Sequence, residues 1–174
     1  IQGHGESMDF NELVRRRYSC RAYKTDAVED DKVRSILEAG RLAPTARNDQ
    51  PVRVIAVRSK EGLAKLEEAG HIYDAPLAFI VCSDKDKAWT RSYDGMKTTD
   101  IDASIVTTQM MYEATDMGLG TLWVCMFKPD VIKRNFGLAD NVIPINILAV
   151  GYRDDQTSKN HGVRIPMEDF VRYA

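Results

Sequence analysis

The chain has 174 residues, of which 44% are hydrophobic and 29% charged, and its formal net charge is −2. This length and composition fit one soluble globular domain, and the near-neutral charge gives no reason to expect a nucleic-acid partner. No apolar run approaches the roughly 20 residues that a membrane-spanning helix needs, so we expect no membrane association. The three cysteines are widely spaced and lack metal-ligand or CxxC spacing, which favours a reduced, cytoplasmic setting over a disulfide framework.

The N-terminal residues 1–7 lack both the basic start and the apolar stretch of a signal peptide, and Met8 follows them. We therefore expect residues 1–7 to be a cloning remnant. The rest shows no internal repeat, low-complexity segment or linker, so residues 8–174 are predicted to form a single domain.

Two helices are predicted before the first strand. Asp9 with Glu12 resembles a capping box and begins a helix over residues 9–17. Acidic residues at 29–31, followed by apolar residues at helical spacing up to Gly40, predict a second helix.

Strands and helices are interspersed from residue 52 on. The apolar patterns predict strands at 52–57, 77–82, 121–125 and 145–150, and helices at 60–69, 99–117 and 129–136. Apolar residues cover much of the circumference of the 99–117 helix, which predicts that it is buried. Residues 84–98 have no clear period and are predicted to be a loop. Because two helices precede the first strand, we expect an α+β sandwich rather than a regular β-α-β alternation.

The most distinctive stretch is RRRYSCRAY at residues 15–23, where four arginines, a serine and two tyrosines follow a predicted helix. Guanidinium groups and a serine hydroxyl match phosphate geometry, so this stretch could hold a phosphomonoester. The alternative is a solvated basic helix end whose arginines interact favourably with the helix dipole. The residues of this stretch alone leave both interpretations open.

Several common chemistries lack their signatures. GxGxxG after the first strand and GxxxxGK[ST] are both absent, which argues against a Rossmann dinucleotide site and a P-loop. The sequence offers no convincing triad, metal cluster or carboxylate pair, and His4, His71 and His161 are scattered, as expected for surface residues.

Motifs spread along the chain resemble, in order, those of the nitroreductase family of flavoenzymes. RRYSCRAY (16–23) looks like the family's opening RRxSxRxF/Y signature, and APTARNDQP (43–51) is similar to its APSxxNxQPW loop. GLGTLWV (118–124) resembles the GLGxxW turn into a strand, while VGY (150–152) and RIPMEDFVRY (164–173) resemble the VGY and RxPLEEVVHY endings. These motifs are collinear and together cover the chain from Met8 to its end.

The resemblance implies an α+β sandwich with a central, mostly antiparallel sheet flanked by helices. It also implies a homodimer that binds two FMN molecules at the subunit interface, with NADH or NADPH as co-substrate and a small-molecule electron acceptor. Because the flavin performs the redox chemistry, no catalytic side chain and no metal is expected.

The family's cofactor-binding positions carry over to this sequence residue by residue. Arg17 and Ser19 would hold the phosphate or ribityl chain, Tyr18 would lend its backbone, and Arg21 would reach the pyrimidine edge of the flavin. The backbone at Cys125 and Met126 would face flavin N5 and O4. The cofactor-binding residues implied by the resemblance are Arg16, Arg17, Tyr18, Ser19, Arg21, Pro44, Thr45, Ala46, Asn48, Gln50, Cys125, Met126 and Arg164, with 44–50 supplied by the partner subunit.

Some positions depart from the family pattern. Gly162 stands where a lysine is often found, which leaves Lys159, Arg164 or both to contact the phosphate. Val52, Thr45 and Arg172 replace the usual Trp, Ser and His. The chain stops soon after residue 173, so we expect no long C-terminal arm around the partner.

Two functions follow from these observations. The first is an FMN-dependent oxidoreductase that passes reducing equivalents from NAD(P)H to a nitroaromatic, quinone or similar acceptor. The second is a flavin carrier or sensor, or a specialised flavin enzyme for dehalogenation or ring oxidation, with little NAD(P)H turnover.

Two local questions also stay open. The side chain of Cys125 is expected to be a small core residue rather than a redox thiol, and the segment around Trp89 and Tyr93 could shape a pocket or be a surface loop.

Overall fold

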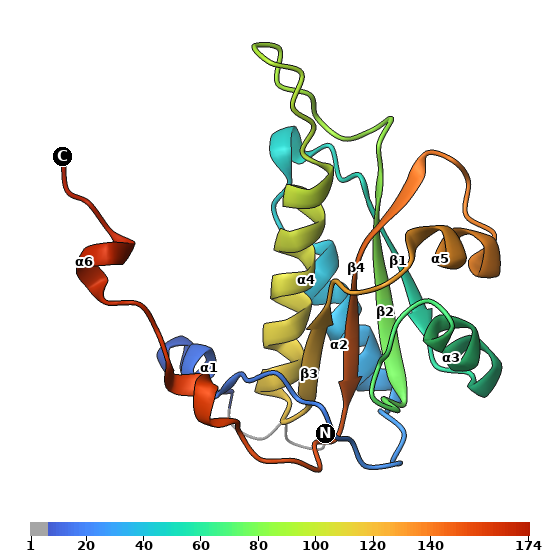
Figure 1. The fold of residues 1–174 in the computed structure, drawn as a ribbon, viewed down its shortest axis with the longest axis vertical. Helices are drawn as coiled ribbons and strands as arrows, with labels where there is room; N and C mark the ends of the chain where they lie inside the picture. The colour runs from blue at the N-terminus through green and yellow to red at the C-terminus, as the bar shows by residue number, and fades with distance from the viewer. Residues whose placement is uncertain (1–6) are drawn as a thin grey trace.

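The fold is built on one four-stranded antiparallel sheet in the order β1-β2-β4-β3 (Figure 1). The computed structural model describes residues 7–174, so the predicted remnant lies outside the described residues except for residue 7. The strands are β1 (Val52–Val57), β2 (Leu77–Asp84), β3 (Gly120–Val124) and β4 (Val142–Gly151). The helices are α1 (Phe10–Arg16), α2 (Asp30–Arg41), α3 (Lys60–Glu67), α4 (Thr99–Asp116), α5 (Pro129–Phe136) and α6 (Met167–Phe170), with short 3-10 turns η1 (Ala46–Asn48) and η2 (Lys159–Gly162).

These elements confirm the predicted α+β class, the four strands and the two leading helices. Among the predicted strands, the largest difference is the start of β4, which lies three residues earlier than predicted, so that the strand includes Pro144. The strand accommodates this proline at a register shift between Val81 and Cys82, where a residue without an N–H costs no ladder bond.

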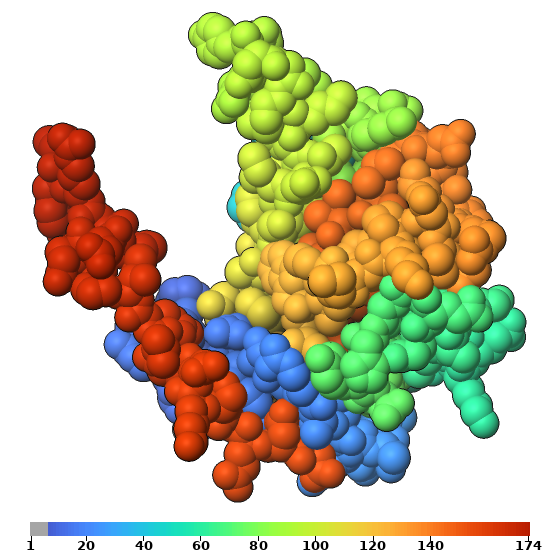
Figure 2. Space-filling model, in the orientation of Figure 1, coloured from blue at the N-terminus to red at the C-terminus, as the bar shows by residue number. Residues whose placement is uncertain are grey.

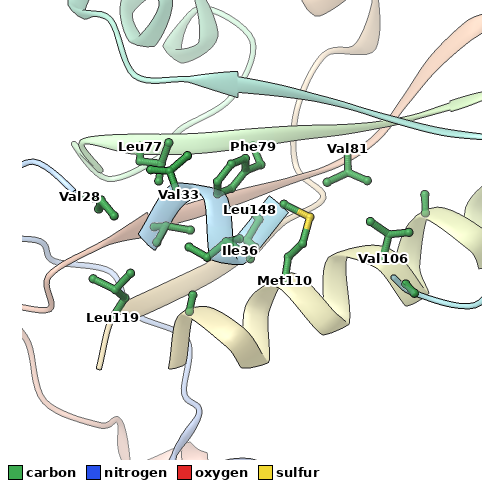
Figure 3. Packing of buried hydrophobic residues seen from close by; sticks show 14 residues of the cluster. Val28, Val33, Ile36, Leu77, Phe79, Val81, Val106, Met110, Leu119 and Leu148 are labelled. Atoms are coloured by element: carbon green, nitrogen blue, oxygen red, sulfur yellow. The ribbon is translucent and has the colours of Figure 1, made fainter. Parts of the chain in front are cut away.

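Helices cover both faces of the sheet. On one face, side chains of α2 and α4 pack against alternate residues of β2 and β4, such as Phe79 and Leu148 (Figure 3). On the other face, α3 and α5 contribute Leu66 and Ile132 to a second apolar cluster. Within the described residues, no helix is both long and apolar enough to cross a lipid bilayer.

The long helix α4 is only half covered, which corrects the prediction that it is buried. Its face with Ala103, Val106 and Met110 is buried against the sheet and α2. Ile101 on the other face is 48% exposed, and Ile105 and Thr108 line a shallow depression there. The apolar pattern therefore extends beyond what one chain covers.

Two segments project from the body of the molecule. Residues 85–98 form an irregular hairpin with a single bridge between Thr90 and Lys97, as expected for a loop, and Tyr93 in this segment is 95% exposed (Figure 1). The C-terminal segment leads away from the body and ends in α6 and an extended stretch (Figure 2). The tail after residue 155 stays largely exposed instead of folding back onto the sheet. Whether it reaches a partner subunit stays a prediction, because the structure describes one chain.

Candidate functional site

The basic segment 17–21 runs as an extended strand-like chain beside the start of β3. The backbone N–H of Cys20 donates to Thr121 O (2.9 Å), and Ser19 forms a parallel bridge with Thr121. Alternate side chains of extended backbone point to opposite sides. Tyr18 and Cys20 are accordingly buried, while Ser19 and Arg21 are exposed. The chain geometry thus directs the side chains of 17, 19 and 21 outward together.

A glycine in β3 makes this close approach possible. A Cβ atom at Gly120 would lie 2.7 Å from Cys20 Sγ and 3.1 Å from Arg153 Cβ. Any side chain at position 120 would therefore push segment 17–21 away from the sheet.

A cationic pocket of about 260 Å³ lies on the outward side of this segment. We use the term for the cavity lined by Arg17, Tyr18, Ser19, Arg21, Ser158, Asn160, His161 and Arg164. Its lining contains no carboxylate. Within residues 7–174, the guanidinium groups of Arg17 and Arg21 form no hydrogen bond or ion pair. The pocket thus presents positive charge that the described part of the chain does not neutralise.

The C-terminal segment supplies the second half of the cationic pocket. The Nε2 atom of His161 in η2 lies 2.8 Å from Arg15 O at the end of α1, and its ring packs edge-on to Tyr18. Arg164 donates from Nη1 to the carbonyl oxygens of His161 and Val163, each at 2.7 Å. Arg164 lines the pocket and Lys159 does not. Of the two tail cations considered from the sequence, the structure thus brings Arg164 to segment 17–21.

Asp155 connects the two halves. Its carboxylate accepts hydrogen bonds from the Tyr18 hydroxyl (2.7 Å) and the Arg21 backbone N–H (2.8 Å), and Cys20 Sγ lies 3.3 Å away. Partial burial alone would raise the pKa of Asp155, but these donors outweigh it and hold that pKa below its usual value. Burial, followed by the contact with Asp155, raises the pKa of Tyr18, so both hydrogen-bonding groups keep their ordinary charge states at neutral pH.

The predicted loop 44–50 forms a second, separate group at the other end of α4. Buried Asp102 accepts hydrogen bonds from the Ala46 N–H (3.0 Å) and the Thr98 hydroxyl (2.8 Å), which fixes the loop to the first turn of the helix. Thr45 Oγ1 accepts from Gln50 N (3.1 Å). Positive φ angles at Arg47, Asn48 and Gln50 complete its tight path. Thr45 and Gln50 line a cavity of about 510 Å³, whose wall includes Val52, Val54 and Val106.

The two groups lie far apart in one chain. The basic segment meets the C-terminal end of α4, where Tyr18, Thr115 and Gly118 line one small cavity. The loop is held at Asp102, near the N-terminal end. A helix rises about 1.5 Å per residue, which separates these positions by roughly 20 Å. A single chain therefore does not bring the two halves of the predicted site together.

Three other predicted residues also lie outside the cationic pocket. Arg16 pairs with Glu12 (3.3 Å) and lines a different small cavity. Cys125 and Met126 follow the end of β3, and both are exposed. The prediction that Cys125 is a core residue was wrong, because the strand ends at Val124 and the chain leaves the sheet there.

Four residues of the pocket region were missed from the sequence: Asp155, Ser158, Asn160 and His161. His161 in particular was interpreted as a scattered surface residue, yet it is partly buried and joins the tail to α1. The only signal in the sequence was the density of polar residues between the last strand and Arg164. Across residues 7–174, no group of three His, Cys, Asp or Glu side chains is arranged to hold a metal ion.

Comparisons with known proteins agree on one family. A family model described as "Nitroreductase family" matches residues 14–72 and 67–152. A "Putative NADH dehydrogenase/NAD(P)H nitroreductase" of Methanothermobacter thermautotrophicus is 31% identical over 173 residues, covering 94% of this chain and 85% of that protein. A nitroreductase family protein from Clostridium difficile 630 shares 50% identity at a TM-score of 0.92, covering 95% of this chain and 98% of that one.

A further solved structure is a "putative nitroreductase in complex with FMN" from Exiguobacterium sibiricum, 23% identical with a TM-score of 0.85 over 99% of this chain and 100% of that one. At this identity the likeness concerns the fold alone. Taken together, the fold and the relatives define an oxidoreductase of the α+β class. The chain belongs to the nitroreductase family.

Proposed function

We propose that this protein is an FMN-dependent oxidoreductase that passes reducing equivalents from NAD(P)H to a nitroaromatic, quinone or similar small acceptor. The observation that carries the proposal is the cationic pocket: its lining has no carboxylate and combines Ser19 with two guanidinium groups that form no hydrogen bond or ion pair within residues 7–174. Guanidinium forks and short hydroxyl donors suit a phosphate dianion. The donor set of the pocket therefore fits the phosphate of FMN.

Each residue would have a distinct task toward the cofactor. Arg17, Ser19 and Arg164 would hold the phosphate and ribityl chain, with Tyr18 contributing its backbone. Arg21 would place positive charge at the pyrimidine edge, and the backbone at Cys125 and Met126 would face the N5 edge. When bound, FMN supplies the hydride-accepting and hydride-donating ring, so the protein needs to bind, orient and set the local charge.

The site would be completed in a homodimer. The loop with Thr45, Asn48 and Gln50 is held at Asp102, whereas Tyr18 of the cationic pocket lies by Thr115, roughly 20 Å further along α4. A two-fold axis across the middle of α4 would place the loop of one subunit beside the pocket of the other. The partly exposed apolar face of α4, including Ile101, supplies a surface for such pairing.

The experiment is an absorption spectrum of the purified protein reconstituted with FMN, followed by anaerobic addition of NADPH and then NADH. We expect flavin bands that bleach with a nicotinamide, and ping-pong kinetics with an acceptor because one pocket serves both substrates in turn. Protein that takes up no FMN would refute the proposal. Bound flavin that neither nicotinamide reduces would favour the carrier or sensor function instead.

Matched arginine variants test the pocket itself. Arg21→Gln and Arg17→Gln each remove a guanidinium from the lining, and we expect FMN affinity to fall roughly 10- to 100-fold, as for losing a charge-assisted hydrogen bond. Arg15→Gln removes the same charge from the neighbouring helix end, outside the lining. Equal losses in all three variants would indicate general electrostatics rather than a built site.

A further inference from the structure

The carboxylate of Asp155 is placed where simple electrostatics argues against it. It lies next to segment 17–21, which carries the positive charge of the cationic pocket, and it contacts three residues of that segment. A negative charge beside an anion site opposes anion binding through space. If Asp155 favours anion binding, it must do so through an effect that outweighs this repulsion.

The hydrogen-bond pattern shows what that role can be. One oxygen of Asp155 accepts from the Tyr18 hydroxyl and the other from the Arg21 backbone N–H. These donors flank Ser19 on either side. Asp155 also stands at the start of the C-terminal segment, directly after the pairing of the Asp154 N–H with Ala22 O (2.8 Å). Together with this backbone pairing and the contact of His161 with Arg15 O, the Asp155 side chain joins segment 17–21 to the tail that carries Ser158, His161 and Arg164.

From this arrangement we propose that Asp155 is a positioning residue for phosphate binding. Its carboxylate holds the two halves of the cationic pocket in register, so that Ser19, Arg21 and Arg164 point at one anion. It does so without touching the ligand, since it is not among the residues that line the pocket. This inference rests on the proposed function and extends it to a residue outside the predicted set.

The variant Asp155→Asn separates positioning from charge. The variant removes a negative charge next to the anion site, so electrostatics alone predicts tighter FMN binding. An amide, however, accepts with its oxygen only. With that oxygen on the Arg21 N–H, the NH₂ faces the Tyr18 hydroxyl, which must then accept instead of donate; in the other orientation the NH₂ faces the Arg21 N–H. In either orientation one charge-assisted hydrogen bond to the carboxylate is lost. Positioning therefore predicts weaker binding, and the two effects differ in sign.

The control is Asp154→Asn. It makes the same charge change one residue away, at an exposed side chain that forms no hydrogen bond within the described residues. The dissociation constants of FMN and riboflavin are measured with apoprotein by flavin fluorescence, and melting temperatures are recorded without ligand. Riboflavin lacks the phosphate, so the ratio of the two constants isolates the cationic pocket from general damage.

For Asp155→Asn we expect FMN binding at least tenfold weaker, about 1.4 kcal/mol, with riboflavin binding changed less than threefold. Asp154→Asn should leave both constants near those of the wild type. If Asp155→Asn does not fold, Tyr18→Phe removes one of the same hydrogen bonds and should shift the FMN-to-riboflavin ratio in the same direction.

The outcomes are distinguishable. Wild-type protein that binds no FMN overturns the proposed function, and this inference with it. Wild-type protein that prefers FMN, together with an Asp155→Asn ratio equal to that of Asp154→Asn, overturns the positioning role alone. Tighter FMN binding by Asp155→Asn overturns it as well, and equal weakening of both flavins would reduce Asp155 to a structural residue.

Discussion

The contact between Gly120 and Cys20 gives a sharp test of how the basic segment is held. In Gly120→Ala the new Cβ would meet Cys20 Sγ at 2.7 Å and Cys20 Cβ at 3.0 Å. Cys20 is fully buried and its backbone N–H is bonded to Thr121 O at 2.9 Å, so it cannot yield by rotating into solvent. Relief requires segment 17–21 to move away from β3, which weakens that hydrogen bond and misplaces the outward side chains.

Overpacking of this kind costs about 2 kcal/mol. For a chain of this size each kcal/mol lowers the melting temperature by about 2–4 °C, so we expect a drop of roughly 4–8 °C. FMN affinity should fall with it, because Arg17, Ser19 and Arg21 shift together. Thermal unfolding of the apoprotein and FMN titration measure the two effects separately.

Two further variants make the interpretation specific. Gly162→Ala places a methyl group where no atom lies within 4 Å and should leave the melting temperature unchanged. Cys20→Ala removes the 2.7 Å Sγ contact, so the double variant with Gly120→Ala should be more stable than the sum of the single effects. An unchanged melting temperature for Gly120→Ala, or strict additivity in the double variant, would refute the packing described here.

Two other predictions concern cysteine reactivity and acid stability. Cys125 is exposed while Cys20 and Cys82 are buried, and burial raises the thiol pKa of Cys20 to about 11. A thiol reagent should therefore modify one cysteine in the native protein and three in denaturant. Mass spectrometry identifies the modified residues, and labelling of Cys20 in the native protein would contradict the structure. The pKa of Asp155 is lowered on folding, so its stabilising effect is fully present above the unfolded-state pKa of about 4 and is lost as pH falls through its lower folded-state value. The difference in unfolding free energy between wild type and Asp155→Asn, measured in urea, should therefore be larger at pH 6 than at pH 3. An equal difference at both pH values would show that the ionised form of the Asp155 carboxylate does not stabilise the folded state.

The sheet and its helices were largely predictable because their signals are local. The run from Leu77 to Cys82 is apolar at every position, and all of it is buried between two helical layers. The start of β4 was not predictable, since Pro144 argues against a central strand on local grounds. Only the register of β2 against β4, with its irregularity beside Cys82, explains how the proline fits.

The candidate site was predictable in part. The arginines and Ser19 were found because cationic and hydroxyl groups concentrate in a few residues. Asp155 and His161 could not be found this way, because their roles depend on contacts with residues more than 130 positions away in sequence. The residue pattern of a polar tail does not predict contacts with residues so far away in the sequence.

The incorrect prediction for α4 carries information of its own. Apolar residues on two faces of a helix indicate two surfaces to cover, and the sequence pattern does not say which molecule covers each. The sheet and α2 cover the face of Met110, while Ile101 on the other face stays 48% exposed. The loop held by Asp102 and the cationic pocket lie near opposite ends of that same helix. A second copy packed on the open face in antiparallel fashion would cover the remaining apolar residues and join the separated halves of the site in one step. The excess apolar pattern and the divided site are thus two consequences of the same proposed interface.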